Sequence, residues 1–271
     1  MNKMIQASET LLVDTGNIIK CKQLTKKVFD SIADEMVESV RHCLASLAQS
    51  SANAHSKAEV EYTHENHSSV VSPDDVKRVR IVVKVFLSPR EDNALSQAVR
   101  KAISHLGVSR IDLLVVAFPQ PVGGHKLELH HMQPAWRVCE SLVAEGLVAS
   151  VGVSDLDMTQ LRELHQWAPF VKPSTNQLHY ESAVALSADM TEFAAENNIQ
   201  LLSHADDIAT TGAGTVRKML AEYKEDADDW ACAWVTRYTV AFHCRGVLYS
   251  KGYIVKLSRE QVVNDKRPPT A

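Results

Sequence analysis

Ile81-Val82-Val83-Lys84-Val85-Phe86 is the stretch of the sequence that decides the fold. Apart from Lys84 the run is apolar throughout and has no helical period, which is typical of a strand buried on both faces. Three further runs share this character, and helical patterns separate them: Leu113 to Ala117, Val148 to Val153 and Ile199 to Leu202. Strands that alternate with helices in this way form parallel sheets joined by right-handed crossovers. The pattern predicts an α/β fold, either an open doubly wound sheet or a closed barrel.

The helices between these runs carry start and stop signals. From Asn93 to Leu106 the apolar residues recur on one helical face, and Gly107 follows as a left-handed stop. A second helix is predicted from Pro134, which suits the first turn, to Glu145. Further helices are predicted from Asp157 onward, from Ser187 to Asn197, and along the stripe from Phe29 to Leu47.

Length favours the barrel, because a (β/α)₈ barrel takes roughly 250 residues and the chain has 271. The remaining strand candidates are Leu11–Val13 with Ile18–Ile19, Val60–Tyr62, Ser174–Leu178, and either Val240–Phe242 or Val247–Tyr249. We therefore predict one (β/α)₈ TIM-barrel-like domain that spans residues 1–271. The polar stretch after Tyr62 cannot bury a helical face. We expect it to lack the standard helix after strand 2, and residues 49–79 to form a long, partly flexible segment.

Composition excludes several classes of protein. Lys and Arg number 29 against 33 Asp and Glu, a net charge of −4, so no global excess of positive charge favours nucleic-acid binding. The apolar run from Leu113 to Phe118 is far shorter than the ~20 residues of a membrane helix. The first ten residues lack the apolar core of a secretory signal. Five scattered cysteines without a CxxC pair are typical of a reducing compartment, so we predict a cytoplasmic protein.

Three of the predicted strands carry polar residues inside the strand or at its end. The carboxyl ends of the strands are where a barrel carries its active site. Lys84 interrupts an apolar run, and an unpaired buried charge costs several kcal/mol. A functional task and a strand end that lets the amine reach water both remain open for it. Ser154-Asp155 and Asn176-Gln177 end two other strands. The histidines lack a second pair of ligands at metal spacing, so no metal site is expected.

Five segments, in their order along the chain, resemble the aldo-keto reductases: Ile81–Phe86, Asp112–Pro119, Gly152–Asp155, Asn176-Gln177 and Trp234–Tyr238. The resemblance implies a (β/α)₈ barrel that reduces carbonyls with NADP(H). It also implies a catalytic tetrad of Asp, Tyr, Lys and His. Tyrosine is the general acid of that chemistry, and lysine only lowers its pKa.

Compared position by position, most of that tetrad is missing. Lys84 fills the lysine position, Ala117 replaces the histidine, and no Asp and Tyr follow Val60–Tyr62 at the family's spacing. We therefore expect no catalytic residues, with Lys84 as a remnant. The remnant cofactor positions are Ser154, Asp155 (in place of asparagine), Asn176, Gln177 and His204 (in place of the stacking tyrosine). No resident cofactor is expected, although these remnants leave room for weak NADP(H) binding.

A narrower resemblance extends from about residue 11 to 256. Blocks such as Leu11–Ile19, Gly152–Asp157 and Ser250–Ile254 resemble the regulatory (modifier) subunits of glutamate–cysteine ligase, a catalytically degenerate branch of the same superfamily. This implies a non-catalytic protein that forms a heterodimer with the ligase catalytic subunit. It would improve the apparent affinity for glutamate and relieve feedback by glutathione in the first step of glutathione synthesis.

Two other hypotheses for the function remain. Lys84 and Asn176-Gln177 would suit an active NADP(H)-dependent aldo-keto reductase with an atypical proton donor, and a barrel that binds a small molecule without turnover is the third possibility. For the regulatory reading, we expect the partner to dock on the loops His125–Gln133 and His204–Gly214. Cys21 and Cys244 stand beside Lys or Arg, which favours the thiolate, so one of them is predicted to be the most reactive cysteine.

Overall fold

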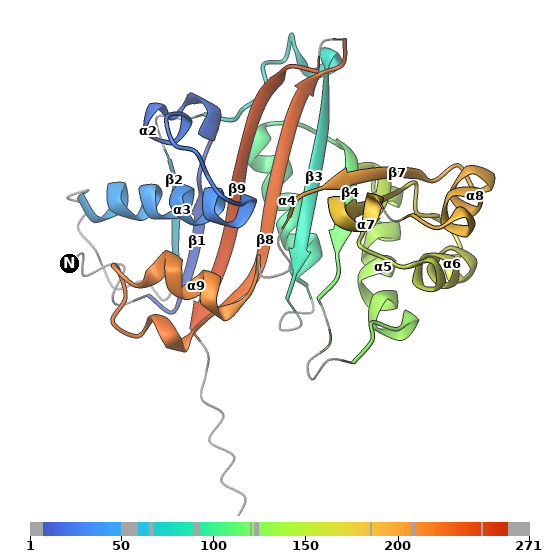
Figure 1. Cartoon of the computed structure of the whole chain (residues 1–271). Helices are drawn as coiled ribbons and strands as arrows, with labels where there is room; N and C mark the ends of the chain where they lie inside the picture. Colours follow the sequence, from blue (N-terminus) through green and yellow to red (C-terminus); the bar gives the residue numbers. More distant parts are fainter. Residues whose placement is uncertain are drawn as a thin grey trace, which may run out of the picture.

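Within the described residues, a single mixed sheet of nine strands runs through the molecule (Figure 1). The computed structural model describes residues 8–49, 59–64, 68–88, 93–119, 121, 125–184, 186–206, 210–244 and 246–259. The strands are β1 (Thr10–Asp14), β2 (Glu59–Thr63), β3 (Val79–Leu87), β4 (Ile111–Ala117), β5 (Val148–Ser154), β6 (Thr175–His179), β7 (Gln200–His204), β8 (Trp230–Phe242) and β9 (Leu248–Arg259). Across the sheet their order is β2-β1-β9-β8-β3-β4-β5-β6-β7.

From β3, the strand that carries Lys84, to β7 the strands follow one another in chain order. Each of them is parallel to the next. The helices between them are α4 (Ala94–Leu106), α5 (Leu129–Ala144), α6 (Met158–Trp167) and α8 (Ala188–Glu196). The predicted α/β architecture, with parallel strands joined by helical crossovers, is confirmed.

β8 and β9 form a long antiparallel hairpin in the middle of the sheet. The two runs that competed for the last strand both lie in it, because Val240–Phe242 ends β8 and Val247–Tyr249 overlaps the start of β9. Parallel strands need a crossover of about a dozen residues or more, and the turn 243–247 is too short for one. The hairpin adds a ninth strand to the eight expected. It leaves β2 and β7 as the two ends of the order, and among the described residues these two do not pair.

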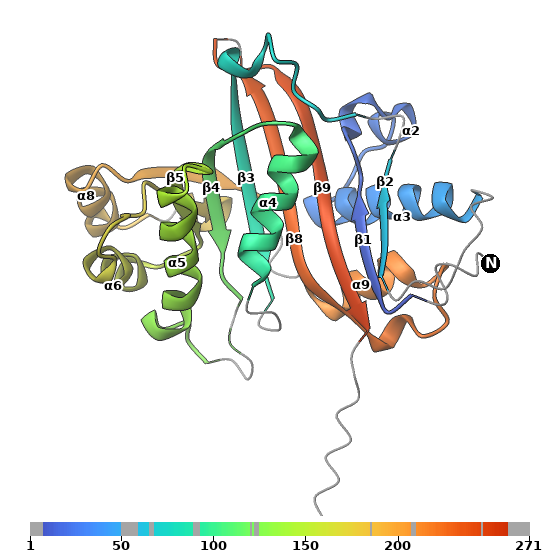
Figure 2. The same ribbon diagram turned by 180° about the vertical axis from the view of Figure 1, so that it is seen from behind.

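Helices cover both faces of the sheet (Figures 1 and 2). α3 (Ile32–Gln49) and α9 (Ala213–Leu220) lie on one face, and α4 and α5 lie on the other. Side chains that alternate along the strands enter a separate hydrophobic core on each face. In β3, Val83 and Val85 belong to the core with α4, and Phe86 belongs to the core with α3 and α9. Burial on both faces explains why this run is continuously apolar.

The segment between β2 and β3 carries no standard helix in its described part. Its one helical element there is the three-residue 3₁₀ helix η2 (Val76–Arg78), as the polar composition predicts. Of the segment 49–79, expected to be partly flexible, residues 50–58 and 65–67 lie outside the described ranges. The part after residue 67 is anchored on α4, because Val71 is buried and its N–H donates to the C=O of Leu106 at 2.9 Å.

Two local predictions are wrong. Ile18–Ile19, expected as strand, lies in the 3₁₀ helix η1 (Ile18–Lys20), because the chain turns at Gly16, whose φ is 61°. α5 begins at Leu129 rather than at Pro134, because Glu128 and His131 form a capping box that satisfies its first turn.

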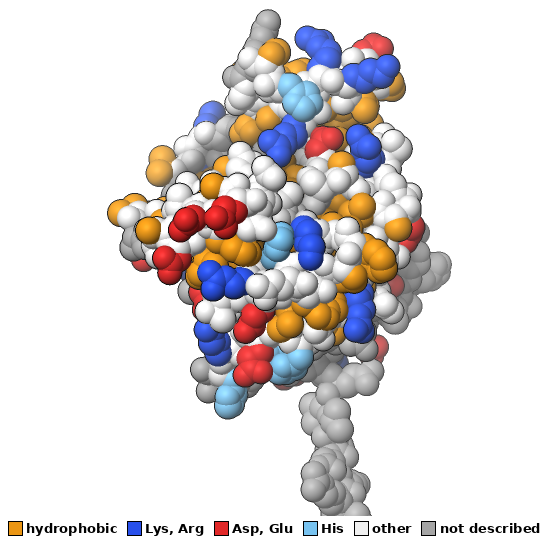
Figure 3. Space-filling view, turned by 90° about the vertical axis from the view of Figure 1, so that its right-hand side faces the viewer, with side chains coloured by type: hydrophobic (Ala, Val, Ile, Leu, Met, Phe, Trp, Pro, Cys, Tyr) orange, Lys and Arg blue, Asp and Glu red, His pale blue; other side chains and the backbone are white. Residues whose placement is uncertain are grey.

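The shorter elements complete the chain: α2 (Lys22–Thr25), α7 (Tyr180–Val184) and the 3₁₀ helix η4 (Ala227–Asp229). In the described ranges, no helix combines the length and the apolar character needed to cross a membrane. The end of the molecule where β7 and α8 lie presents hydrophobic and charged side chains side by side (Figure 3).

Candidate functional site

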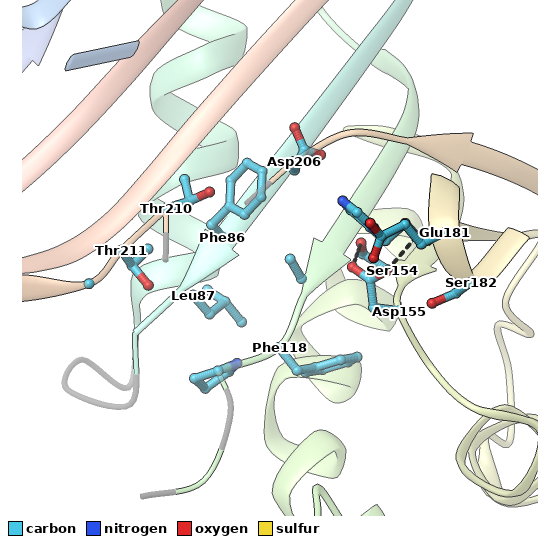
Figure 4. A pocket seen from close by; sticks show the side chains of 14 residues that line it. Phe86, Leu87, Phe118, Ser154, Asp155, Glu181, Ser182, Asp206, Thr210 and Thr211 are labelled. Carbon is cyan, nitrogen blue, oxygen red and sulfur yellow. Dashed lines mark hydrogen bonds between the residues drawn. The ribbon is translucent and has the colours of Figure 1, made fainter. Parts of the chain in front are cut away.

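A pocket of about 670 Å³ opens at the carboxyl ends of the parallel strands (Figure 4). Phe86, Leu87 and Phe118 form an apolar wall, and Asp155 and Glu181 lie across from them. The other lining residues are Ala117, Pro119, Ser154, His179, Ser182, Asp206, Thr210, Thr211 and Gly212. Its place matches the edge where barrels of this class carry function.

Lys84 lies behind this pocket, fully enclosed by protein. Its Nζ donates to Oδ2 of Asp206 at 2.7 Å and to Oγ of Ser154 at 2.8 Å, and the Lys84 and Asp206 side chains are each 2 % exposed. Burial lowers the pKa of the Lys84 amine, and the attraction of Asp206 opposes this only in part. The lysine therefore has a buried partner. Its amine does not reach water at a strand end, which was one of the two alternatives left open by the sequence.

Arg237 of β8 supplies a second cation to the same carboxylate. Its two terminal nitrogens donate to the two oxygens of Asp206, with Nη2 3.0 Å from Oδ2. Burial raises the pKa of Asp206, but Arg237 and Lys84 outweigh it and hold that pKa below its usual range. The ring of Phe86 lies beneath both cations, 5.2 Å from the Lys84 Nζ and 6.0 Å from the Arg237 Cζ. One ionised carboxylate thus pairs with two cations, the buried Lys84 and the half-buried Arg237.

Ser154, Asp155 and His204 form a second set of hydrogen bonds beside the first. The backbone N–H of Asp206 donates to Nδ1 of His204 at 3.0 Å, which assigns the ring proton to Nε2. That Nε2 lies 2.9 Å and 3.0 Å from the two oxygens of Asp155, and the Ser154 hydroxyl donates to Asp155 Oδ2 at 2.7 Å. Burial raises the pKa of Asp155, but the hydrogen bonds from His204 and Ser154 prevail and lower it to about 2.

Distances alone would suggest a Ser-His-Asp triad here. Ser154 Oγ lies 3.2 Å from His204 Nε2, and His204 Nδ1 lies 3.3 Å from Asp206 Oδ2. The protons point the wrong way, because Nε2 carries the hydrogen and cannot accept one from the serine. Ser154 instead donates to Asp155 and accepts from Lys84. The arrangement is a closed set of satisfied hydrogen bonds and has no poised nucleophile.

The described pocket lining differs from the pattern implied by the reductase resemblance at the positions of the histidine and the tyrosine. Ala117 contributes a methyl group to the lining, and no tyrosine is among the lining residues that the structure describes. Two of the buried tyrosines are engaged elsewhere: Tyr238 donates to the C=O of Gly16 at 2.6 Å, and Tyr253 donates to Glu35 at 2.6 Å. Lys84 therefore has no phenol whose pKa it could lower.

Of the predicted remnant positions, the structure brings Lys84, Ser154, Asp155 and His204 together and places Ala117 in the pocket wall. Asn176 and Gln177 do not line the pocket. Asn176 is fully buried, its Nδ2 donates to the C=O of Leu156 at 2.9 Å, and its Oδ1 has no hydrogen-bond partner. The Asn176 amide therefore belongs to the interior of the sheet, and Gln177 is half-buried outside the pocket lining.

Sequence reasoning missed Asp206 and Arg237, which hold the centre together. Arg237 could have been predicted in the same way as Lys84, because it is a charged residue within a largely apolar run, Trp234 to Tyr238. Asp206 gave no such signal, since it follows β7 in a short polar stretch that resembles any surface turn.

The prediction for the reactive cysteines needs one correction. Cys21 is 1 % exposed, because it packs with Ile18 and Leu24 of the same segment in the core beneath α3. The neighbouring lysines indicated positive charge near the thiol but gave no information on its burial. Cys244 is exposed in the turn between β8 and β9. Cys43 and Cys139 are buried as predicted, and burial raises the pKa of both thiols well above the ordinary value.

The fold and this centre have counterparts among known proteins. A family model described as the aldo/keto reductase family matches residues 52–230, and the chain belongs to that family. Within it, the chain is 32 % identical to the glutamate–cysteine ligase regulatory subunit of Mus musculus, over 94 % of this chain and 95 % of that one. The Homo sapiens subunit is 32 % identical with the same coverage of both chains. The chain belongs to this family of regulatory subunits.

A more distant relative points the same way. The putative glutamate–cysteine ligase regulatory subunit of Schizosaccharomyces pombe is 24 % identical, over 65 % of this chain and 70 % of that one.

Proposed function

We propose that this chain regulates a glutamate–cysteine ligase by binding its catalytic subunit in a heterodimer. Bound there, it lowers the glutamate concentration that the ligase needs and relieves inhibition by glutathione. The proposal is supported by the similarity along nearly the whole length to proteins named as regulatory subunits. The cytoplasm, where scattered thiols stay reduced, is the compartment that we propose for it.

The observation that carries the proposal is the state of the pocket centre. Lys84, the one tetrad residue retained, is hydrogen-bonded to Asp206 and Ser154, and the described lining of the pocket holds no tyrosine, the general acid of carbonyl reduction. A missing general acid costs about 10²–10⁴ in rate. We infer that the chain itself catalyses no reaction and that the ligase chemistry belongs to the partner.

Carbonyl reduction with NADP(H) is the second candidate, and the pocket does not fit that cofactor. The described lining holds the carboxylates Asp155, Glu181 and Asp206 and no Lys or Arg, so phosphate groups would meet negative charge. The amides of Asn176 and Gln177, remnants of nicotinamide contacts, do not reach the pocket. We propose that the protein works without a resident nicotinamide cofactor.

Regulation of this kind requires a preference for one state of the partner. A subunit that binds both states equally shifts nothing, so the chain must favour the conformation with higher glutamate affinity. The segments His125–Gln133, which continues into the first turn of α5, and His204–Gly214, which continues into α9, remain our prediction for the region of contact, although residues 207–209 lie outside the described ranges.

The test is a steady-state titration of the ligase catalytic subunit with the purified chain. We expect the glutamate concentration for half-maximal rate to fall and the glutathione concentration for half-inhibition to rise. The chain alone should oxidise no NADPH with carbonyl substrates. Unchanged glutamate and glutathione responses would refute the regulatory function, and NADPH turnover that depends on Lys84 would establish the reductase.

A further inference from the structure

β7 is an end strand of the sheet with one edge free of strand neighbours. In the described part of the chain it pairs only with β6, and Figure 1 shows it running from α8, at one end of the molecule, towards the middle. The N–H of Gln200 donates to Ser174 of the β6 side at 2.9 Å. Because a parallel ladder uses alternate residues, Leu202 and His204 also face β6, and the backbone groups of Leu201 and Ser203 face outward.

The two end strands of the sheet differ in how their edges are protected. β2 carries Glu59 and Glu61, and Glu61 forms an ion pair with Lys101. Charged residues on an edge discourage another strand from pairing with it. β7 reads Gln200-Leu201-Leu202-Ser203-His204 and holds no Asp, Glu, Lys, Arg or Pro. Of the two edges, only β7 lacks this protection.

The surroundings of β7 indicate the charge of an incoming segment. The unit from Pro173 to Asp206, which comprises β6, α7, α8 and β7, contains no Lys or Arg. Its exposed acidic residues are Glu181, Asp189, Glu192 and Glu196. Acidic side chains gather on one side of this end of the molecule, with Lys and Arg side chains of neighbouring segments beside them (Figure 3); one of these neighbours, Arg162 of α6, lies over the ring of Phe193 in α8. A second copy of the same acidic unit would be repelled, whereas a basic segment would be attracted.

Apolar contact is available beside the edge. Tyr180 and Val184 of α7 are 52 % and 88 % exposed, and α7 packs against β7. Large exposed apolar side chains next to polar ones are typical of contact surfaces. The edge thus combines unpaired backbone groups, two apolar side chains and negative charge.

We propose that the free edge of β7 takes up an extended, Lys- or Arg-bearing segment of the ligase catalytic subunit as a tenth strand. The proposal rests on the regulatory function proposed above and assigns its docking site. Main-chain hydrogen bonds from Leu201 and Ser203 supply affinity, as in other complexes formed by strand addition. The carboxylates around β7 select the basic partner.

The experiment compares substitutions at Ser203, an exposed residue whose N–H faces outward. Ser203→Pro removes that N–H and blocks the edge without removing a bond to β6. Thr63→Pro is the matched control, because Thr63 is an exposed residue of the other end strand, β2. The N–H of the next residue, His64, donates to the C=O of Asp14 in β1, so the N–H of Thr63 faces outward. We expect Ser203→Pro to weaken binding of the catalytic subunit at least about tenfold and Thr63→Pro to leave it unchanged.

A second pair of variants, Ser203→Lys and Ser203→Glu, keeps the backbone N–H. It therefore tests the effect of charge separately from the effect of strand pairing. Ser203→Lys should weaken the complex about tenfold, and Ser203→Glu should retain it, because only the lysine repels a basic segment. Equal losses for both would overturn the basic partner. Thermal unfolding of each isolated variant shows whether it remains folded.

Hydrogen exchange on the unsubstituted protein gives an independent readout. We expect the amides of Leu201 and Ser203 to become protected when the catalytic subunit is added. If the subunit binds and its glutamate response changes while these amides stay unprotected and Ser203→Pro binds normally, the docking site is wrong and the function stands. If no binding occurs at all, the proposed function fails. If the isolated chain dimerises and Ser203→Pro abolishes the dimer, the edge is used by a second copy and the assigned partner is wrong.

Discussion

Lys84 and Arg237 stand directly opposite each other on β3 and β8, and the carboxylate of Asp206 binds both. Like charges directly opposite on neighbouring strands destabilise a sheet. Here Asp206 offsets that repulsion, because each cation lies within hydrogen-bond distance of its carboxylate. Lys84, the residue that matches the reductase lysine, thus belongs to a cluster of three charged side chains.

Removal of that carboxylate should be costly. Asp206→Asn leaves two cations facing each other in the protein interior, and breaking a buried pair in this way typically costs about 3–5 kcal/mol. Urea unfolding monitored by circular dichroism measures the loss. Asp189→Asn, at an exposed acid on α8, is the control and should stay within about 0.5 kcal/mol of the unsubstituted protein. Equal midpoints for Asp206→Asn and the original chain would contradict the ion-cluster interpretation.

Lys84 should be dispensable for regulation. In Lys84→Ala, Asp206 still has Arg237 as a partner, so the carboxylate is not left alone. We expect the glutamate and glutathione responses of the catalytic subunit to persist, with a loss of stability from the cavity and the missing bond to Ser154. Ligase assays with and without the variant measure this. A regulatory effect that disappears in a variant still folded by circular dichroism would give Lys84 a role that we do not assign to it.

Asp155 should contribute to the acid sensitivity of the fold. Its pKa falls from 3.8 to about 2 in the folded protein, so its stabilising contribution is present above pH 4 and is lost as the pH falls towards 2. Asp155→Asn should therefore flatten the decrease of unfolding free energy over this range. Urea midpoints at several pH values between 2 and 6 provide the measurement. An unchanged slope in the variant would show that the carboxyl titrates normally.

Cys244 should be the first cysteine to react with a thiol reagent under native conditions. It is exposed, whereas Cys21, Cys43, Cys139 and Cys232 are buried. Burial raises the pKa of Cys232 to about 12, which suppresses its thiolate. Iodoacetamide labelling followed by peptide mass spectrometry gives the order of reaction, and Cys244→Ser should abolish the fast phase. Earlier labelling of Cys21 would show that its segment opens readily.

The sequence allowed the parallel half of the sheet to be predicted, but not its middle. Ile81–Phe86 and the runs after it had both the apolar continuity of doubly covered strands and helices with capping signals, such as Asp157 with Gln160, between them. β8 and β9 offered no helix between them, and apolar continuity alone does not distinguish a parallel strand from an antiparallel one. Only the shortness of the turn 243–247 indicated a hairpin.

The candidate site was predicted in part for a similar reason. Lys84 was conspicuous because its charge lies within an apolar run, and Ser154 and Asp155 because they end a strand. The partner of Lys84 could not be inferred, since Asp206 lies 122 positions further along the chain and reaches the lysine only through the ladder from β3 to β7. Contacts of this kind depend on the register of several strands, which no local pattern encodes.

The position of the β8–β9 hairpin also has a consequence for synthesis on the ribosome. The first strand made, β1, lies beside the last one, β9, and β3 lies beside β8. Until residue 259 has emerged, β1, β2 and α3 have no strand that connects them to β3 and its successors. The nascent chain must therefore hold two unfinished halves, each with apolar surface exposed, until the last strand emerges. Such intermediates are prone to aggregation, so early termination within the hairpin should yield protein that chaperones retain rather than a smaller folded product.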